Sequence, residues 1–349
     1  MKMENEAFAR RIIAWYAQSG RKNLPWQKDH SIYSVWISEI MLQQTQVNTV
    51  IPYFEKFMAL FPDIETLAKA SVDDILCVWA GLGYYSRARN IHKAATIIED
   101  LGAFPEGLEA LMALPGIGKS TAGAILSLAL DRPYTILDGN VKRVLCRFLS
   151  ISGWPGTASV EKHLWQVAEQ YTPIQNNQIY SQAMMDLGAT VCVRKNPSCA
   201  KCPLQEQCQS FKDDTMLQYP YPKAKKNRPL KKIIMAVIMN EKQQVLLLKR
   251  ADSGIWGGLY SFPECDEETN LDQWLKNKWG CKSYGQTSLA QIKHQFSHFQ
   301  LHISPLLINI KASSGVADDC NIWVDINRYQ EVALPAPITL IFEVLNESR

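Results

Sequence analysis

The sequence predicts a mainly α-helical protein whose C-terminal part is a smaller α+β domain. Apolar residues recur at helical spacing from residue 6 to residue 190, and a basic, proline-rich stretch then separates this region from β-rich runs. With 349 residues, 47% of them apolar and 20% charged, the chain is long enough for two domains with separate cores. We therefore expect domains at residues 1–215 and 232–349, joined by a linker at residues 216–231.

The first region is predicted to contain one helix after another. Prolines such as Pro62 and Pro105 fall between helical segments, where they end one helix and let the next begin. No alternating run of strand length interrupts the pattern, so we expect an all-helical domain. The clearest segments, with apolar residues three and four positions apart, are residues 8–16, 35–45, 50–60, 72–80, 88–101 and 122–130.

The sequence changes character at residues 219–229, which contain three prolines. Six basic and no acidic residues lie between Lys223 and Lys232, and such a stretch favours an extended linker. The following α+β domain is predicted from its β-rich runs and one helical segment. The strands are expected at residues 232–239, 245–250, 301–310 and 322–324, and the helix at residues 271–279.

Composition bounds the setting of the protein. No apolar run approaches the ~18–20 residues that span a bilayer, and no apolar segment precedes the first charges at the N-terminus. We expect a soluble, cytoplasmic protein without membrane contact, in which the nine cysteines are reduced thiols or metal ligands. The net charge of +3 does not by itself predict a nucleic-acid binder.

Four cysteines lie close together in the sequence. Cys192, Cys199, Cys202 and Cys208 follow the spacing C-x6-C-x2-C-x5-C, which suits one inorganic centre with four ligands. A structural zinc usually takes pairs separated by two to four residues, whereas each iron of an iron–sulfur cube takes a single cysteine. The spacing therefore favours an iron–sulfur cluster, with zinc and four unrelated core cysteines as alternatives.

A glycine-containing turn joins two predicted helices at residues 114–122. Gly116 and Gly118 allow a sharp turn that presents N–H groups near a helix N-terminus, which favours phosphate binding, although a plain helix connection fits as well. Asp138 follows, between the apolar residues Ile136 and Leu137 and a new helix. From local sequence it is a functional carboxylate or an ordinary N-cap.

Together these motifs resemble the endonuclease III superfamily of helix-hairpin-helix DNA glycosylases. They comprise LPGIG-x-x-TA, an aspartate about twenty residues later, and the cysteine run. Residues 36–46 (WISEIMLQQTQ), residues 81–89 (GLGYYSRAR) and the long C-terminal extension are similar to the adenine DNA glycosylases within that superfamily. The resemblance extends from about Trp15 to at least His298. It implies base excision repair by hydrolysis of the N-glycosidic bond of adenine mispaired with 8-oxoguanine or guanine, leaving an abasic site.

The resemblance also implies a catalytic pair. Glu39 would protonate adenine N7, and Asp138 would stabilise the cationic sugar beside C1′, with Asn140 as its hydrogen-bond partner. Without the resemblance, Glu39 reads as a surface residue and Asn140 as a turn residue. Bifunctional members of the superfamily carry a lysine two residues past the second glycine, whereas this chain has Ser120, which implies a monofunctional enzyme with Ser120 in a supporting role. The adjacent Lys119 would point about 100° away on a helix.

The resemblance places the chain on double-stranded DNA as a monomer. Gly116 and Gly118 would bind phosphate, and Gln44 and Tyr84 would wedge into the duplex, although Tyr84 alone reads as a core residue. The four cysteines would hold one 4Fe–4S cluster in a loop at residues 192–208. The basic residues expected to face the DNA backbone are Arg87, Arg89, Lys142, Arg143 and Arg147.

The C-terminal domain resembles a Nudix domain that has lost its metal site. Gly258 and Glu264 keep the opening of the Nudix box, but Lys276 and Asn277 replace its metal-binding glutamates. The resemblance therefore implies a binding domain that reads 8-oxoguanine through Phe296, Ser297 and His298.

Three other functions fit the sequence less well. A bifunctional glycosylase/lyase conflicts with Ser120, and a nucleoside-triphosphate hydrolase conflicts with Lys276 and Asn277. A redox protein or non-enzymatic DNA-binding module leaves Glu39 together with Asp138 unexplained.

Overall fold

The computed structural model describes residues 2–224, 227–266, 269–296, 298–311 and 321–347. These residues form two compact units. The first comprises Met1–Lys69 and Asn90–Lys225, and the second comprises Ala70–Arg89 and Lys226–Arg349. The second unit therefore combines the C-terminal part of the chain with a short stretch from much earlier in the sequence.

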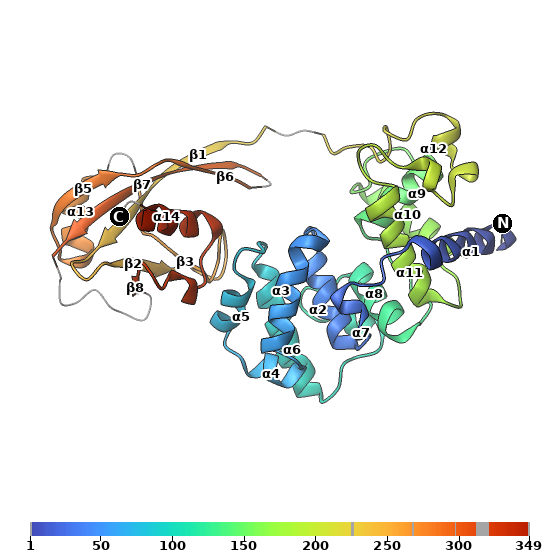
Figure 1. Ribbon diagram of the computed structural model, residues 1–349, viewed down its shortest axis with the longest axis horizontal. Helices are drawn as coiled ribbons and strands as arrows, with labels where there is room; N and C mark the ends of the chain where they lie inside the picture. Colours follow the sequence, from blue (N-terminus) through green and yellow to red (C-terminus); the bar gives the residue numbers. More distant parts are fainter. Residues whose placement is uncertain (1, 225–226, 267–268, 297, 312–320, 348–349) are drawn as a thin grey trace. The chain divides into compact units, whose positions relative to one another are not determined.

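The first unit is helical, and the part of it that the structure describes contains no strand (Figure 1). Helix α6 begins in the second unit and continues into the first. The elements, in chain order, are α1 (Lys2–Ser19), η1 (Pro25–Gln27), α2 (Ile32–Leu42), α3 (Val47–Leu60), α4 (Ile64–Lys69), α6 (Ser86–Leu101), α7 (Leu108–Met112), α8 (Lys119–Leu130), α9 (Gly139–Phe148), α10 (Ala158–Tyr171), α11 (Asn177–Asp186), the π-helical turn η2 (Leu187–Val191), η3 (Cys199–Lys201), η4 (Gln205–Gln207) and α12 (Gln209–Lys212).

Helices α2 and α8 form the centre of this unit. Most residues of α2 are buried, and so is every residue of α8 from Ala122 to Leu128, because a helix that is apolar on most of its faces is stable only inside a core. Helix α8 packs against α2 and α11. This packing brings Glu39 of α2 and the first turn of α8 to the same region of the unit.

The second unit contains helix α5 (Val72–Trp79) and an eight-stranded mixed sheet. The strand order is β3-β2-β1-β7-β5, with β4 paired to β1, β6 to β7 and β8 to β2. Strands β1 and β7 run parallel, with Ile233 opposite Ile303, and the other pairs are antiparallel. The strands are β1 (Leu230–Met239), β2 (Gln244–Lys249), β3 (Tyr260–Ser261), β4 (Glu264–Cys265), β5 (Ser283–Ser288), β6 (Ile292–Gln295), β7 (Gln300–Ile310) and β8 (Asn321–Asp325).

Two helices pack against this sheet. Leu275 of α13 (Leu271–Trp279) belongs to a buried cluster with Ala236 and Ile238 of β1. Alternate residues of a strand point to opposite faces, so the buried Val237 faces the other side. Helix α14 (Ala336–Glu347) lies against the sheet in Figure 1, and its Phe342 ring is 5.5 Å from that of Phe262.

The structure confirms the predicted fold class of a helical region followed by an α+β region. The predicted helix at residues 35–45 is Ile32–Leu42, and the predicted strand at residues 232–239 is Leu230–Met239. Helix α14 was not predicted. Within the described residues, no helix is both long enough and apolar enough to cross a membrane.

Candidate active site and cysteine centre

Glu39 and Asp138 line one cavity of the first unit. The cavity has a volume of about 390 Å³, and Gln44, Ser120 and Asn140 also line it. Glu39 projects from α2, Ser120 from the first turn of α8, and Asp138 immediately precedes α9. Three segments that are far apart in the sequence thus place two carboxyl groups and several hydrogen-bonding side chains around one space.

Glu39 favours its protonated form. Part of its surface remains open to the cavity, but the apolar helix around it removes most of its hydration. Burial, followed by the nearby charge of Asp138, raises the pKa of Glu39 to about 8. At neutral pH this side chain therefore carries a proton that it can donate.

Asp138 is the N-cap of α9 and also a wall of the cavity. Its carboxylate accepts hydrogen bonds from the backbone N–H of Val141 at 2.8 Å and of Asn140 at 3.1 Å, and from Asn140 Nδ2 at 2.9 Å. Burial raises the pKa of Asp138, whereas these hydrogen bonds and the charge of Arg143 act in the opposite direction because they favour the ionised form. Asp138 is therefore the N-cap that was one of the two readings left open by the sequence, and its side chain also lines the cavity.

Asn140 links Asp138 to the cysteine loop. Arg143 Nη2 donates to Asn140 Oδ1 at 2.8 Å, and Arg143 Nε donates to the carbonyl oxygen of Cys192 at 2.7 Å. The turn η2 comes close to this chain of contacts because Gly188 has no side chain. A Cβ on Gly188 would lie 2.5 Å from the Asn140 Cβ.

The glycine turn connects α7 to α8. Gly116 has a φ of +81°, and a Cβ on it would lie 2.9 Å from that of Asn90, so glycine is required here for both conformation and space. Gly118 is the N-cap of α8 and has no capping side chain. Ser120 in the same turn accepts a hydrogen bond from the backbone N–H of Leu137 at 2.9 Å.

The basic residues expected to face DNA are arranged in different ways. Lys142 forms an ion pair with Glu161 at 2.6 Å, and Arg143 makes the contacts just described. The expectation is wrong for Arg87 and Arg147, because both side chains are buried and donate to backbone carbonyl groups. Arg89 donates to the carbonyl oxygen of Gly257 within the second unit.

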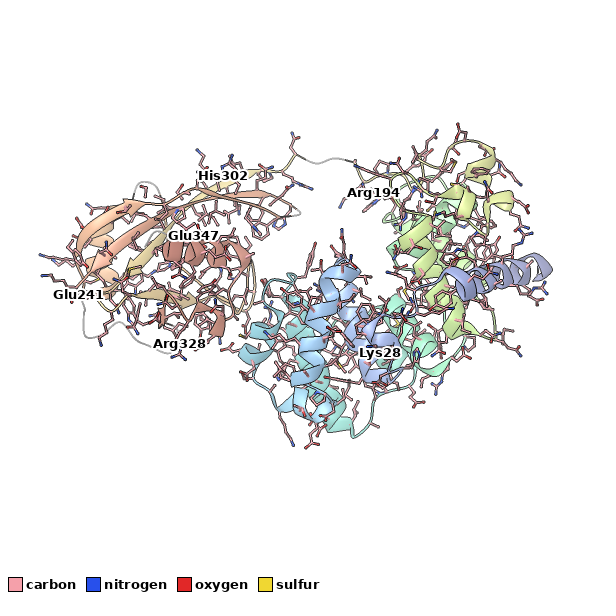
Figure 2. All side chains as sticks on the ribbon, viewed as in Figure 1. Lys28, Arg194, Glu241, His302, Arg328 and Glu347 are labelled. Atoms are coloured by element: carbon pink, nitrogen blue, oxygen red, sulfur yellow. The ribbon has the colours of Figure 1, made fainter. Side chains whose placement is uncertain are left out.

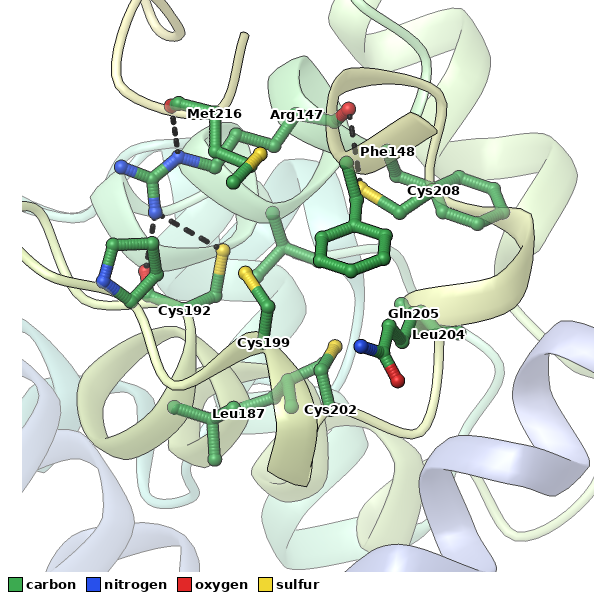
Figure 3. A pocket seen from close by; sticks show the side chains of 14 residues that line it. Arg147, Phe148, Leu187, Cys192, Cys199, Cys202, Leu204, Gln205, Cys208 and Met216 are labelled. Carbon is green, nitrogen blue, oxygen red and sulfur yellow. Dashed lines mark hydrogen bonds between the residues drawn. The ribbon is translucent and has the colours of Figure 1, made fainter. Parts of the chain in front are cut away.

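The four cysteines surround one small apolar space (Figure 3). Its volume is about 30 Å³, and Leu187, Leu204 and Phe148 also line it. No three His, Cys, Asp or Glu side chains among the described residues are grouped closely enough to hold a single metal ion. Figure 3 shows the thiols pointing into the space from different sides, which fits a multi-iron group with one cysteine per iron better than a single ion.

Burial and the neighbouring Arg147 determine the environment of these thiols. Burial raises the pKa of Cys192, Cys199 and Cys202, so a cationic centre would be needed to hold them as thiolates. Arg147 Nη1 donates to Cys192 Sγ at 3.4 Å and to the Val193 carbonyl oxygen at 2.8 Å. Arg147 therefore holds the loop that carries the first cysteine.

The predicted wedge residues share an uncommon backbone conformation. Gln44 has a φ of +57° and Tyr84 a φ of +50°, values that non-glycine residues adopt rarely and often at functional positions. Gln44 is exposed at the cavity that Glu39 and Asp138 line, and Tyr84 is 50% exposed. This conformation is a structural signal that the sequence did not carry.

Within the second unit, Tyr84 lines a cavity of about 560 Å³ together with Trp256, Phe296 and His298. The Phe296 ring stacks on Phe299 with centroids 4.6 Å apart and lies 5.6 Å from that of Trp256. Ser297, the middle residue of the predicted reading loop, lies outside the described residues.

The residues at the Nudix-box positions contact other side chains of the protein. Glu264 forms an ion pair with Arg250 at 2.6 Å, and Asn277 accepts a hydrogen bond from Gln273 at 2.8 Å. Gly258 keeps a φ of +77°. The turn conformation therefore survives, but the carboxylate of Glu264 is paired with a cation of the protein itself.

Comparisons with known proteins agree with these two parts. Residues 37–170 match the family described as HhH-GPD superfamily base excision DNA repair protein, and residues 234–344 match the NUDIX domain. The chain is 43% identical over 341 residues to the adenine DNA glycosylase of Buchnera aphidicola subsp. Schizaphis graminum. This match covers 97% of this chain and 98% of that protein.

Solved structures resemble the helical part. A thermostable thymine-DNA glycosylase is 25% identical, with a TM-score of 0.53, over 60% of this chain and 98% of its own. A non-covalent endonuclease III–DNA complex is 20% identical, with a TM-score of 0.52, over 61% of this chain and 98% of that one. The second likeness concerns the fold alone.

Proposed function

The chain belongs to the adenine DNA glycosylase family, and from this premise we propose that it removes adenine mispaired with 8-oxoguanine or guanine. The protein is a DNA glycosylase of base excision repair, a hydrolase that acts on N-glycosyl bonds. Membership of this family was inferred from the sequence and is confirmed. The base specificity rests on further observations.

The observation that supports the chemistry most strongly is that Glu39 and Asp138 line one cavity in different surroundings: burial and the charge of Asp138 raise the pKa of Glu39, whereas Asp138 accepts three hydrogen bonds that favour its ionised form. Loss of a purine from deoxyribose needs an acid for the leaving base and negative charge beside the cationic sugar. Glu39, with a pKa of about 8, provides the acid. Asp138, which accepts three hydrogen bonds, provides the negative charge.

The reaction proceeds in two steps, departure of the base and addition of water. The Glu39 carboxyl group gives its proton to adenine N7 while the C1′–N9 bond breaks and its electron pair leaves with the base. Asp138 stabilises the positive charge that develops at C1′. The oxygen of a water molecule then bonds to C1′, and the proton released from that water passes to a carboxylate of the pair. The products are free adenine and an abasic site.

The identity of residue 120, two positions past the second glycine of the glycine turn, accounts for the absence of strand cleavage. Ser120 offers no amine for a Schiff base, and the neighbouring Lys119 forms an ion pair with Glu169 at 2.9 Å. Lys142 is similarly paired with Glu161. We therefore infer a monofunctional enzyme, with Ser120 and Asn140 supporting the catalytic pair.

Cys192, Cys199, Cys202 and Cys208 would hold one 4Fe–4S cluster. The four thiols around one apolar space support this assignment. When bound, the cluster would stabilise the fold of the loop at residues 192–208. The chemical steps at C1′ need only the residues of the catalytic cavity.

DNA binding is supported by the family and by the hairpin. Gly116 and Gly118 would bind a phosphate at the start of α8, and Gln44 and Tyr84 would each wedge into the duplex. We also propose that Lys142 and Arg143 contact DNA. To do so, Lys142 would leave its ion pair with Glu161, and Arg143 would leave its hydrogen bond to Asn140. We propose that the enzyme acts as a monomer on double-stranded DNA in the bacterial cytoplasm.

Reading of 8-oxoguanine is assigned to the C-terminal domain, at residues 232–349 beyond the 216–231 linker. The cavity that contains Tyr84, Phe296 and His298 supports this assignment, because its aromatic rings can stack on a base and His298 can hydrogen-bond to the base edge. Phe296, Ser297 and His298 would together distinguish the oxidised base from guanine.

The test is strand cleavage by hot alkali after incubation with duplexes containing A:8-oxoguanine, A:G, A:C or A:T. Alkali-labile sites should form only at the adenine, most rapidly opposite 8-oxoguanine. Ser297→Ala combined with His298→Ala should reduce that preference, since a paired polar contact contributes ~1–3 kcal/mol of discrimination. His302→Ala on β7, labelled in Figure 2, is the control. Equal cleavage of all four duplexes would refute the assigned specificity.

A further inference from the structure

The first turn of α8 is attached to the residue that precedes Asp138. Ser120 Oγ accepts the backbone N–H of Leu137 at 2.9 Å. Leu137 is 3% exposed, and residues 131–138 have no repetitive secondary structure in which this N–H could find a ladder partner. The Ser120 hydroxyl thus satisfies a buried donor next to the catalytic carboxylate, and leaving such a donor unpaired costs free energy.

Asp138 is consequently held from two sides. On its C-terminal side, the N–H groups of Asn140 and Val141 fix its carboxylate at the start of α9. On its N-terminal side, the bond from Leu137 to Ser120 fixes its backbone to α8. Helix α8 packs against α2, which carries Glu39. The bond from Leu137 to Ser120 therefore also fixes the position of Asp138 relative to Glu39.

We propose that Ser120 is a positioning residue that acts through Leu137 to place the Asp138 carboxylate beside C1′. This inference rests on the proposed function and deepens it, because it gives Ser120 a defined task beyond the lack of an amine. A protonated lysine at this position has three donors and no acceptor. Residue 120 can therefore provide either a basic side chain or an acceptor for Leu137.

The experiment compares Ser120→Ala with Ser120→Thr, which keeps a hydroxyl group. Ser127→Ala is the matched control, since Ser127 is a buried serine of the same helix whose hydroxyl bonds to Ala124 within that helix. Three quantities are measured on the full-length protein. They are the single-turnover rate of adenine release with saturating enzyme, the dissociation constant for the duplex, and the hydrogen-exchange rate of the Leu137 amide.

We expect Ser120→Ala to slow adenine release by about tenfold or more while duplex affinity stays within about twofold, because only the placement of Asp138 changes. The Leu137 amide should exchange faster in this variant. Ser120→Thr should recover most of the rate and the protection, and Ser127→Ala should behave like the unaltered protein. If Ser120→Ala does not fold, Ser120→Cys replaces it, because sulfur is only a weak acceptor.

Two results would overturn the proposal. One is an unchanged rate in Ser120→Ala, and the other is a slower rate with unchanged exchange at Leu137. Failure of the proposed function is a separate result, because the unaltered protein would then release no adenine, while the Leu137 exchange rate would still report on the hydrogen bond.

Discussion

Glu39 and Asp138 line the same cavity, and the charge of Asp138 is one of the two causes that raise the pKa of Glu39 to about 8. While Asp138 is ionised, its negative charge repels a second carboxylate and so disfavours removal of the proton from Glu39. The carboxylate of Asp138 accepts hydrogen bonds from Asn140 Nδ2 and from the backbone N–H of Val141, and these bonds favour its ionised form. The pair is thus arranged for one acid and one carboxylate.

The first prediction concerns pH. Adenine release under single-turnover conditions should be level below about pH 8 and should fall about tenfold per pH unit above it, because the proton of Glu39 is lost there. Glu39→Gln should be slow at every pH and should lack this fall. The measurement is a rate profile from pH 6 to about 9.5 on a mispaired duplex. A rate that increases through pH 8 would mean that Glu39 acts as a base.

The second prediction concerns the close approach of η2 to Asn140. Gly188→Ala places a Cβ 2.5 Å from that of Asn140, so we expect a cost of ~1–3 kcal/mol in stability and a slower reaction as Asn140 moves away from Asp138. Thermal unfolding and single-turnover rates measure the two effects. Gly107→Ala is the control, because its Cβ would meet only Ala110 at 3.9 Å. Equal midpoints for the two variants would contradict the predicted clash.

The third prediction concerns the cysteine centre. The purified protein should show broad visible absorption from thiolate-to-iron charge transfer and about four irons per chain. Cys202→Ala should lose iron and become unstable, because metal binding contributes to folding, whereas the buried Cys146→Ala, which lies outside the cysteine-lined space, should keep its iron. Metal analysis decides the matter, and a colourless protein with stoichiometric zinc would refute the cluster.

The fourth prediction concerns the hairpin position. Ser120→Lys should introduce an amine that borohydride traps on the DNA, together with strand scission. Its adenine release should also be at least as slow as that of Ser120→Ala, because the acceptor for Leu137 is lost. Gel analysis after borohydride treatment detects the adduct, and the unaltered protein with its Lys119 serves as the control. Adenine release without any trapped adduct would place residue 120 too far from C1′.

Sequence patterns predicted helices α1, α2, α3, α5, α6, α8 and α13, strands β1, β2, β7 and β8, and the grouping of the four cysteines, because periodicity and spacing are local properties. Helices α4, α10 and α11 and strands β5 and β6 were not predicted as separate elements. Helix α14 was missed although Ile338, Ile341, Phe342 and Leu345 have helical spacing. The short strands β3 and β4 have two residues each and carry too little pattern to be recognised.

The directions of long side chains could not be predicted. Arg147 is one turn of helix beyond Arg143 and was expected to face DNA, but the carbonyl groups that bind it come from Val193, Arg194 and Met216, far along the chain. The bond between Ser120 and Leu137 joins residues that are likewise separated in sequence. Such contacts depend on how distant segments pack, which one sequence without its structure does not reveal.

The most direct test of the catalytic pair is chromatographic detection of free adenine released from an A:8-oxoguanine duplex by the unaltered protein and by Asp138→Asn. The asparagine keeps the shape of the side chain and removes its charge, so adenine release should fall by ~10²–10³ or more while duplex binding is retained. Asp131→Asn, at the left-handed C-cap of α8, is the matched control and should release adenine normally. Release by Asp138→Asn at the rate of the unaltered protein would contradict the role assigned to Asp138.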